Sequence, residues 1–118
     1  MSRERDIQRL ILDWLAAQKI WHIRLNTGAM SGAHKGKRWF VRFGKPGMAD
    51  ILIVGSCPVS IAGENRIRYW SQVAWVEVKA PKGVQSEDQK AFQKEVEAAG
   101  MTYILARSLE DVSDALQR

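Results

Sequence analysis

Three charged residues at the ends of two apolar runs have types and a spacing that could do chemistry. Asp50 comes directly before the apolar residues 51–54, and Glu77 and Lys79 come just after the apolar residues 73–76. Because side chains alternate between the two faces of a strand, Glu77 and Lys79 would project to the same side. If the two runs pair as strands, two carboxylates and an ammonium group converge at one edge of a sheet.

A convergence of this kind could support metal-assisted hydrolysis of a phosphodiester. Mg²⁺ takes oxygen ligands such as carboxylates, and a nearby ammonium group can orient or deprotonate the attacking water. Charged pairs at strand ends are also common on protein surfaces. The spacing alone therefore leaves open a purely structural interpretation of Asp50, Glu77 and Lys79.

The hydrophobic pattern predicts the helices and strands that would position these residues. Residues 2–19 carry apolar side chains at helical spacing, and residues 86–99 begin with Ser86 and Gln89, which form a capping-box signature. A closing helix is expected from residue 108 to the C-terminus. Strands are expected over residues 20–25, 39–43, 50–54, 66–79 and 102–106.

The order of these elements predicts a single α/β domain over residues 1–118, in which helices flank one central mixed sheet. The helix that begins at Ser86 would be a crossover connection between strands 66–79 and 102–106. Such connections join parallel strands, so these two strands are expected to be parallel.

Two glycine-bearing segments are expected to lie outside the core. Residues 28–37 are small and basic, which is typical of a flexible loop. Residues 55–63 contain Pro58 and are expected to form a turn or loop, and a break in the following strand is expected near residues 71–72. Residues 55–71 as a whole are interpreted as a protruding hairpin insertion.

The charge of the chain favours a polyanionic partner. The formal net charge is +5, and no amphipathic or membrane-spanning segment accompanies it, so nucleic acid is expected before a membrane. The single cysteine, Cys57, excludes an intramolecular disulfide, and the N-terminal residues lack the core of a signal peptide. These features predict a cytoplasmic protein.

Five short motifs occur in order along the chain. They are Glu4-x-x-Ile7-Gln8, Arg24-x-Asn26-Thr27-Gly28-Ala29, Gly47-x-x-Asp50-Ile51, Glu77-Val78-Lys79 and Gly83-x-x-Ser86-x-x-Gln89. As an ordered set they resemble the VRR-NUC (virus-type replication-repair nuclease) family of the PD-(D/E)XK nuclease superfamily. The chain departs from the family pattern at Ala49, where a proline is usual, and in the long connection over residues 55–71. The resemblance implies a restriction-endonuclease-like core with the order α-β-β-β-α-β-α.

The resemblance also implies a metal-dependent endonuclease, for which physical roles can be assigned. Asp50 and Glu77, with the backbone carbonyl oxygen of Val78, would bind Mg²⁺ or Mn²⁺. Lys79 would position the attacking water. A role as general base would require burial or cationic neighbours to lower the pKa of this lysine.

Glu4 and Gln89 complete the implied catalytic set, and each has a structural alternative. On a helical projection Glu4 lies about 60° from the centre of the apolar stripe, but it could simply complement the positive end of the helix dipole. Gln89 could close a capping box with Ser86. The resemblance implies an active-site role for both Glu4 and Gln89.

Further residues are candidates for contacts with DNA. A basic cluster could neutralise phosphates, although each lysine taken singly could be no more than a solvated side chain. The candidates are Asn26, Lys35, Lys37, Arg38, Arg42, Lys45 and Lys82.

The expected function is cleavage of branched DNA, such as a Holliday junction or a flap, during replication, repair or recombination. A homodimer is expected, because a symmetric four-way junction needs two sites related by a two-fold axis. The resemblance implies a phage or prophage protein in the cytoplasm of a bacterial or phage-infected cell. Two alternatives are a restriction-like nuclease that acts on ordinary duplex and a basic DNA-binding module without catalysis.

Overall fold

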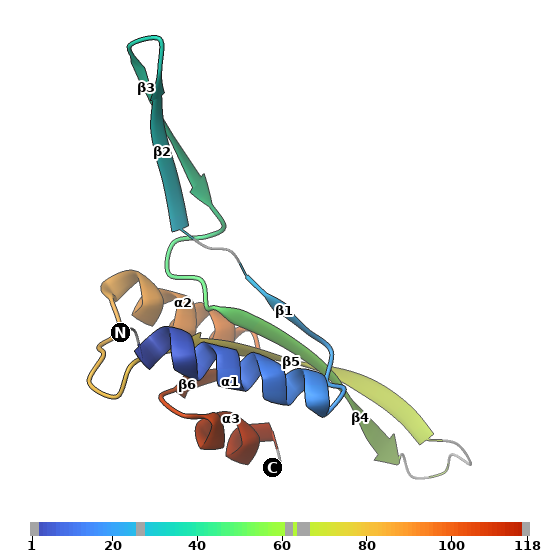
Figure 1. Ribbon diagram of the computed structural model, residues 1–118. Helices are drawn as coiled ribbons and strands as arrows, with labels where there is room; N and C mark the ends of the chain where they lie inside the picture. Colours follow the sequence, from blue (N-terminus) through green and yellow to red (C-terminus); the bar gives the residue numbers. More distant parts are fainter. Residues whose placement is uncertain (1–2, 26–27, 61–62, 64–66, 117–118) are drawn as a thin grey trace.

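The computed structural model describes residues 3–25, 28–60, 63 and 67–116. These residues form an α/β structure with a mixed four-stranded sheet and three helices (Figure 1). The sheet contains β1 (His22–Arg24), β4 (Ile51–Ser60), β5 (Ile67–Val78) and β6 (Thr102–Ala106), in the spatial order β1-β4-β5-β6. Neighbouring strands are antiparallel except β5 and β6, which are parallel. The predicted parallel pair is thus confirmed.

Helices cover the two faces of the sheet unequally. On one face, α1 (Arg3–Ala17) and α3 (Leu109–Leu116) bury Ile11, Leu15 and Val112. These residues pack against alternate strand residues such as Ile51 and Val76, both of which are fully buried. The alternation of strand side chains directs those residues to this face, and their burial stabilises the fold through the hydrophobic effect.

On the other face, α2 (Glu87–Ala98) buries Phe92 and Val96 against the sheet. The ring of Phe92 makes an edge-to-face contact with Trp75, with the ring centroids 5.1 Å apart. Ala49 is fully buried in the same cluster. The residue that departs from the family pattern is therefore a packing residue that contacts the helix carrying Gln89.

A hairpin replaces the flexible loop that was predicted for residues 28–37. β2 (Gly28–His34) pairs in antiparallel fashion with β3 (Lys37–Phe43), and the two form a separate sheet that rises away from the helices (Figure 1). Lys35 and Gly36, with φ of 52° and 78°, make the two-residue turn. The prediction failed because β2 consists mainly of small residues and shows no apolar alternation. Its pairing with β3 depends on the tight turn, which the positive φ values of Lys35 and Gly36 allow.

The turn or loop that was predicted for residues 55–63 is also corrected. β4 continues to Ser60, and β5 runs without a break through residues 71–72. Proline lacks an N–H group and is tolerated in a strand only where no ladder bond is needed from it. Pro58 lies beyond the residues of β4 that pair with β1, so among the described residues the ladder at this position is with β5 alone.

The hairpin and the far end of the β4–β5 ladder both extend beyond the helix-covered part of the molecule (Figure 1). The molecule consequently measures 68 Å along its longest axis and 29 and 26 Å along the others. In the part of the chain that the structure describes, no helix is both long and apolar enough to cross a membrane.

Candidate active site

The sheet brings Asp50 and Glu77 together at one edge. In the β4–β5 register Ile51 lies opposite Val76, so Asp50, one residue earlier, lies beside Glu77. The N–H of Asp50 donates to the carbonyl oxygen of Val76 at 2.9 Å, and the N–H of Val78 donates to Asp50 Oδ2 at 2.8 Å. Through the second bond, the strand that carries Glu77 orients the Asp50 carboxylate.

Glu77 is a buried acid with one unused oxygen. Its side chain is only 2% exposed, and Gln89 Nε2 donates to its Oε2 at 3.0 Å. Its other oxygen, Oε1, is buried and has no hydrogen-bond donor among the described residues. A buried polar atom without a partner is unusual and costly, so this oxygen calls for a proton or a cation.

The pKa of Glu77 also indicates that its carboxyl group requires a proton or a cation. Burial raises the pKa of this carboxyl group to about 9, and the neighbouring Asp50 carboxylate contributes through its charge and by hydrogen bonding to the protonated form. Lys79 lowers the pKa in part, whereas the charge of Glu4 raises it. At neutral pH Glu77 therefore keeps its proton unless additional positive charge is brought to the pair.

Gln89 forms the predicted capping box and also contacts Glu77. Its Oε1 accepts from the N–H of Ser86 at 2.9 Å, and its own N–H donates to Ser86 Oγ at 3.1 Å, which completes a capping box at the start of α2. Its Nε2 remains free to hold Glu77. One side chain thus fixes the helix start and orients the buried acid.

Gly47 fixes the approach of the chain to this site. It has φ of 77°, and a Cβ atom at this position would lie 2.2 Å from the carbonyl oxygen of Asp88 and 2.7 Å from the backbone nitrogen of Gln89. Only glycine allows this contact with the first turn of α2. The segment that leads into Asp50 therefore packs directly beside Gln89.

Lys79 and Glu4 lie near the pair of acids without a direct bond to either carboxylate among the described contacts. Lys79 is half-buried, and its backbone N–H donates to the carbonyl oxygen of Ala106 at 2.9 Å. Glu4 is half-buried in the first turn of α1 and lines a surface cavity of about 760 Å³ with Arg5, Arg9 and Arg24, among others. The effects of Lys79 and Glu4 on the pKa of Glu77 place both charges near this edge of the sheet.

The donor set fits a hard divalent cation. Within the described ranges, no three His, Cys, Asp or Glu side chains gather as a ready-made metal site. The Asp50 and Glu77 carboxylates nevertheless provide adjacent oxygen donors, including the unpartnered Oε1, and Mg²⁺ commonly takes one or two carboxylates and completes its shell with water and phosphate oxygens. Val78 contributes its N–H to Asp50, and the ligation by its carbonyl oxygen stays a prediction.

The candidate DNA contacts are spread over two parts of the molecule. Lys35 and Lys37 are exposed at the tip of the hairpin, and Lys82 is exposed in the loop after β5. Lys45 forms an ion pair with Glu95 of α2, so its charge is already partly neutralised. The remaining candidates are Arg38 and Arg42, which lie on β3, and Asn26, which falls outside the described residues.

Arg107 was missed by the reasoning from sequence. It directly follows β6, and its Nη2 donates to the carbonyl oxygen of Gly83 at 2.8 Å, which brings a guanidinium group to the loop after Lys79. The available signal was its position, because the carboxyl ends of parallel strands share an edge, and β6 is parallel to β5.

Nearby, burial raises the pKa of Tyr103 to about 12, while the hydrogen bond from Gln85 Nε2 opposes this shift.

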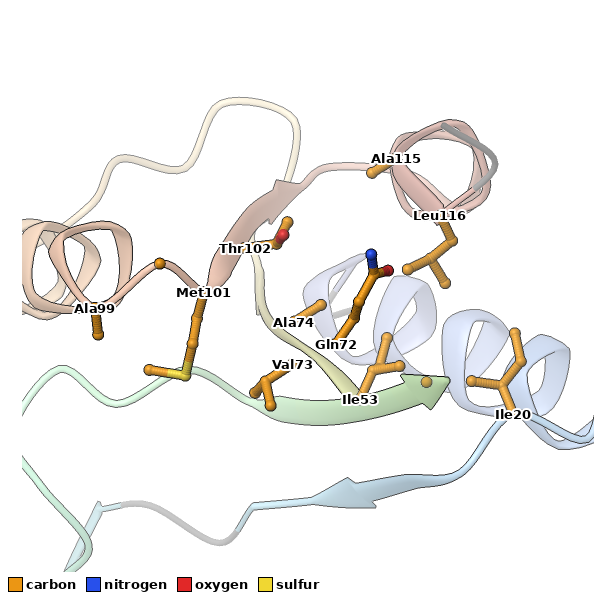
Figure 2. Close-up of a pocket in the computed structure, with 12 residues that line it drawn as sticks. Ile20, Ile53, Gln72, Val73, Ala74, Ala99, Met101, Thr102, Ala115 and Leu116 are labelled. Carbon is orange, nitrogen blue, oxygen red and sulfur yellow. The ribbon is translucent and has the colours of Figure 1, made fainter. Parts of the chain in front are cut away.

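A separate cavity of about 660 Å³ lies at the opposite end of the sheet (Figure 2). Ile53, Val73, Met101 and Leu116 line it, and none of its described lining residues carries an acidic, basic or thiol side chain. Its lining is mostly apolar, and it lies apart from the Asp50–Glu77 edge. Comparisons of the chain with models of protein families, with curated proteins and with solved structures found no match.

Proposed function

We propose that this chain is a metal-dependent endonuclease of the VRR-NUC type, with a restriction-endonuclease-like core, that hydrolyses phosphodiester bonds in structured DNA. The observation that carries the proposal is the adjacency of Asp50 and Glu77, with one buried Glu77 oxygen that no donor satisfies. A buried glutamate whose ionisation is suppressed by burial and by a neighbouring carboxylate provides a binding site that a divalent cation would complete.

The side chains around this pair have distinct proposed roles. When bound, Mg²⁺ or Mn²⁺ would stabilise negative charge on the scissile phosphate and lower the pKa of a bound water. Asp50, oriented by the N–H of Val78, and Glu77, oriented by Gln89, would hold the cation. Glu77 must release its proton to do so. Lys79 would orient the attacking water, and Glu4 would supply a third acid from α1.

The proposed substrate is branched DNA, such as a Holliday junction or a flap, during replication, repair or recombination. The positive charge of the chain supports a nucleic-acid partner, and the resemblance supplies the branched form. A homodimer would present two sites to a junction with two-fold symmetry. The proposed setting is the cytoplasm of a bacterial or phage-infected cell.

Cleavage assays on matched substrates test this proposal. Purified protein would be incubated with labelled linear, flapped and four-way DNA in Mg²⁺, in Mn²⁺ or in EDTA. We expect cleavage with either metal, none in EDTA, and a preference for the branched forms. Equal cleavage of linear duplex would favour a restriction-like nuclease, and binding without cleavage in any metal would favour a non-catalytic module.

Gln89 and Ser86 allow the two roles of the capping box to be separated. Ser86→Ala removes the acceptor for the N–H of Gln89 and should cost about 1 kcal/mol of stability with little loss of cleavage. Gln89→Leu should cost a similar amount of stability and also reduce cleavage about 10- to 100-fold, because Glu77 Oε2 loses its donor. Urea unfolding and single-turnover rates measured across Mg²⁺ concentrations would distinguish the two variants. Equal cleavage rates for the Ser86→Ala and Gln89→Leu variants would mean that Gln89 acts only in the capping box.

A further inference from the structure

The β2–β3 hairpin is a two-stranded ribbon with its own sheet. Neither strand pairs with the four-stranded sheet, and the ribbon stands clear of the three helices (Figure 1). Seven residues in each strand give a length of about 24 Å. An isolated two-stranded hairpin is at best marginally stable in water, so a ribbon in this position gains stability from a partner.

The positive charge of the chain is concentrated in the stretch that contains this ribbon. Residues 14–49 contain seven Lys and Arg residues and no Asp or Glu, whereas all 13 acidic and 11 of the 18 basic residues lie elsewhere. The net positive charge of the protein therefore comes from this stretch. Two copies of such a ribbon would repel each other, whereas a polyanion would be attracted. Charge complementarity thus favours nucleic acid over a second copy of the chain.

The base of the ribbon is attached to the walls of the candidate active site. Before β2, the N–H of Leu25 donates to the carbonyl oxygen of Asp50 at 2.7 Å. After β3, Lys45 pairs with Glu95 of α2, and Gly47 packs against the helix start beside Gln89. Both ends of the ribbon are consequently held within a few residues of the acids.

We propose that the β2–β3 ribbon is a DNA-binding arm that lies along a duplex segment next to the scissile phosphate. This inference rests on the proposed nuclease function and adds a requirement for the substrate, which must carry duplex beside the cleaved bond. A two-stranded ribbon fits the major groove. Its length matches about 7 base pairs at about 3.4 Å each. Lys35 and Lys37, which are exposed at the tip, would supply phosphate contacts.

Substitutions at the ribbon tip test the arm without disturbing the acids. Lys35 has φ of 52° before Gly36, so Lys35→Asn creates a sequence that strongly favours this two-residue turn. It would be combined with Lys37→Gln. The matched control combines Lys19→Asn, at the other described positive-φ lysine (φ 57°), with Lys94→Gln on α2. Each double variant removes two positive charges.

Binding to a labelled 30-base-pair duplex would be measured in EDTA from 50 to 250 mM salt. We expect the tip variant to bind about 10- to 30-fold more weakly at 0.15 M salt, with the slope of log affinity against log salt reduced in magnitude by about 2, whereas the control changes affinity less than about 3-fold. In Mg²⁺, the wild type should cleave substrates with long duplex arms faster than substrates whose arms are shorter than about 7 base pairs.

Each contrary result has a separate meaning. Unchanged affinity and salt slope in the tip variant would overturn the arm, while metal-dependent cleavage in the same preparation would still support the nuclease proposal. A change in oligomeric state on size exclusion with unchanged DNA binding would also overturn the arm and assign the ribbon to contacts between copies. Weakened duplex binding in the tip variant alone, without cleavage by any form of the protein, would support the arm and contradict the nuclease.

Discussion

Replacing Asp50 with asparagine is expected to abolish cleavage and leave DNA binding near the wild-type level. The amide oxygen can still accept from the N–H of Val78, so the edge of the sheet should keep its geometry. The variant removes the negative charge and weakens the proposed metal site. Metal ions contribute several kcal/mol of transition-state stabilisation, and a loss of about 4 kcal/mol corresponds to a rate about 10³-fold lower.

Single-turnover cleavage of a four-way junction in Mg²⁺ measures this effect, and junction binding in EDTA provides the control. Glu77→Gln should behave in the same way, because it is nearly isosteric and its side-chain oxygen can still accept from Gln89. Cleavage by either variant at a rate close to that of the wild type would end the assignment of these acids to catalysis. A loss of binding equal to the loss of cleavage would indicate a structural role.

The second large effect concerns the stability of the metal-free protein. In the folded state burial and the Asp50 carboxylate raise the pKa of Glu77 from 4.5 to about 9, against the opposing effect of Lys79 and with a further contribution from Glu4. Between these values the folded state holds a proton that the unfolded chain has released. The stabilisation is therefore complete below about pH 4.5 and is lost as the pH rises towards about 9.

Urea unfolding in EDTA at several pH values from 5 to 9 measures this dependence. A difference of one bound proton corresponds to at most about 1.4 kcal/mol per pH unit. Glu77→Gln removes the titrating group, so its stability should fall less steeply with pH and should exceed that of the wild type at the alkaline end. Mg²⁺ should restore stability to the wild type but not to the variant. Identical pH profiles for the two proteins would contradict the raised pKa.

Several parts of the fold could be predicted because local signals and tertiary structure agree. Ser86 and Gln89 have the spacing of a capping box, and the box forms. The helix between the two apolar strands required a parallel pair, and β5 and β6 are parallel. The predicted meeting of Asp50 and Glu77 at one edge follows from the same strand pattern, and the β4–β5 register places them there.

Other parts depended on information that the local pattern does not carry. The strand β2 consists mainly of small residues, so its own composition does not indicate a strand. It forms a strand because it pairs with β3 across a tight turn. Pro58 suggested a loop, yet among the described residues its strand pairs at that point with β5 alone. The unsatisfied oxygen of Glu77 and the hydrogen bond from Arg107 to Gly83 arise from the assembled sheet and its loops, and no spacing in the sequence indicates these two contacts.

The double use of Gln89 shows why the site was harder to predict than the fold. Its spacing from Ser86 satisfies a local rule, and its contact with Glu77 exists only because α2 packs on the face of the sheet beside β5. The local rule therefore predicts the helix start and says nothing about the acid that the same side chain orients.

Calorimetric titration of the DNA-free protein with Mn²⁺ tests most directly whether these two acids gather a divalent cation. We predict that the wild type binds Mn²⁺ near neutral pH and releases protons as it does so, which appears as a dependence of the binding heat on the ionisation enthalpy of the buffer. Asp50→Asn and Glu77→Gln should weaken binding by at least about 10-fold. Mn²⁺ binding that is unchanged in both variants, or absent from the wild type, would rule out Asp50 and Glu77 as a metal site.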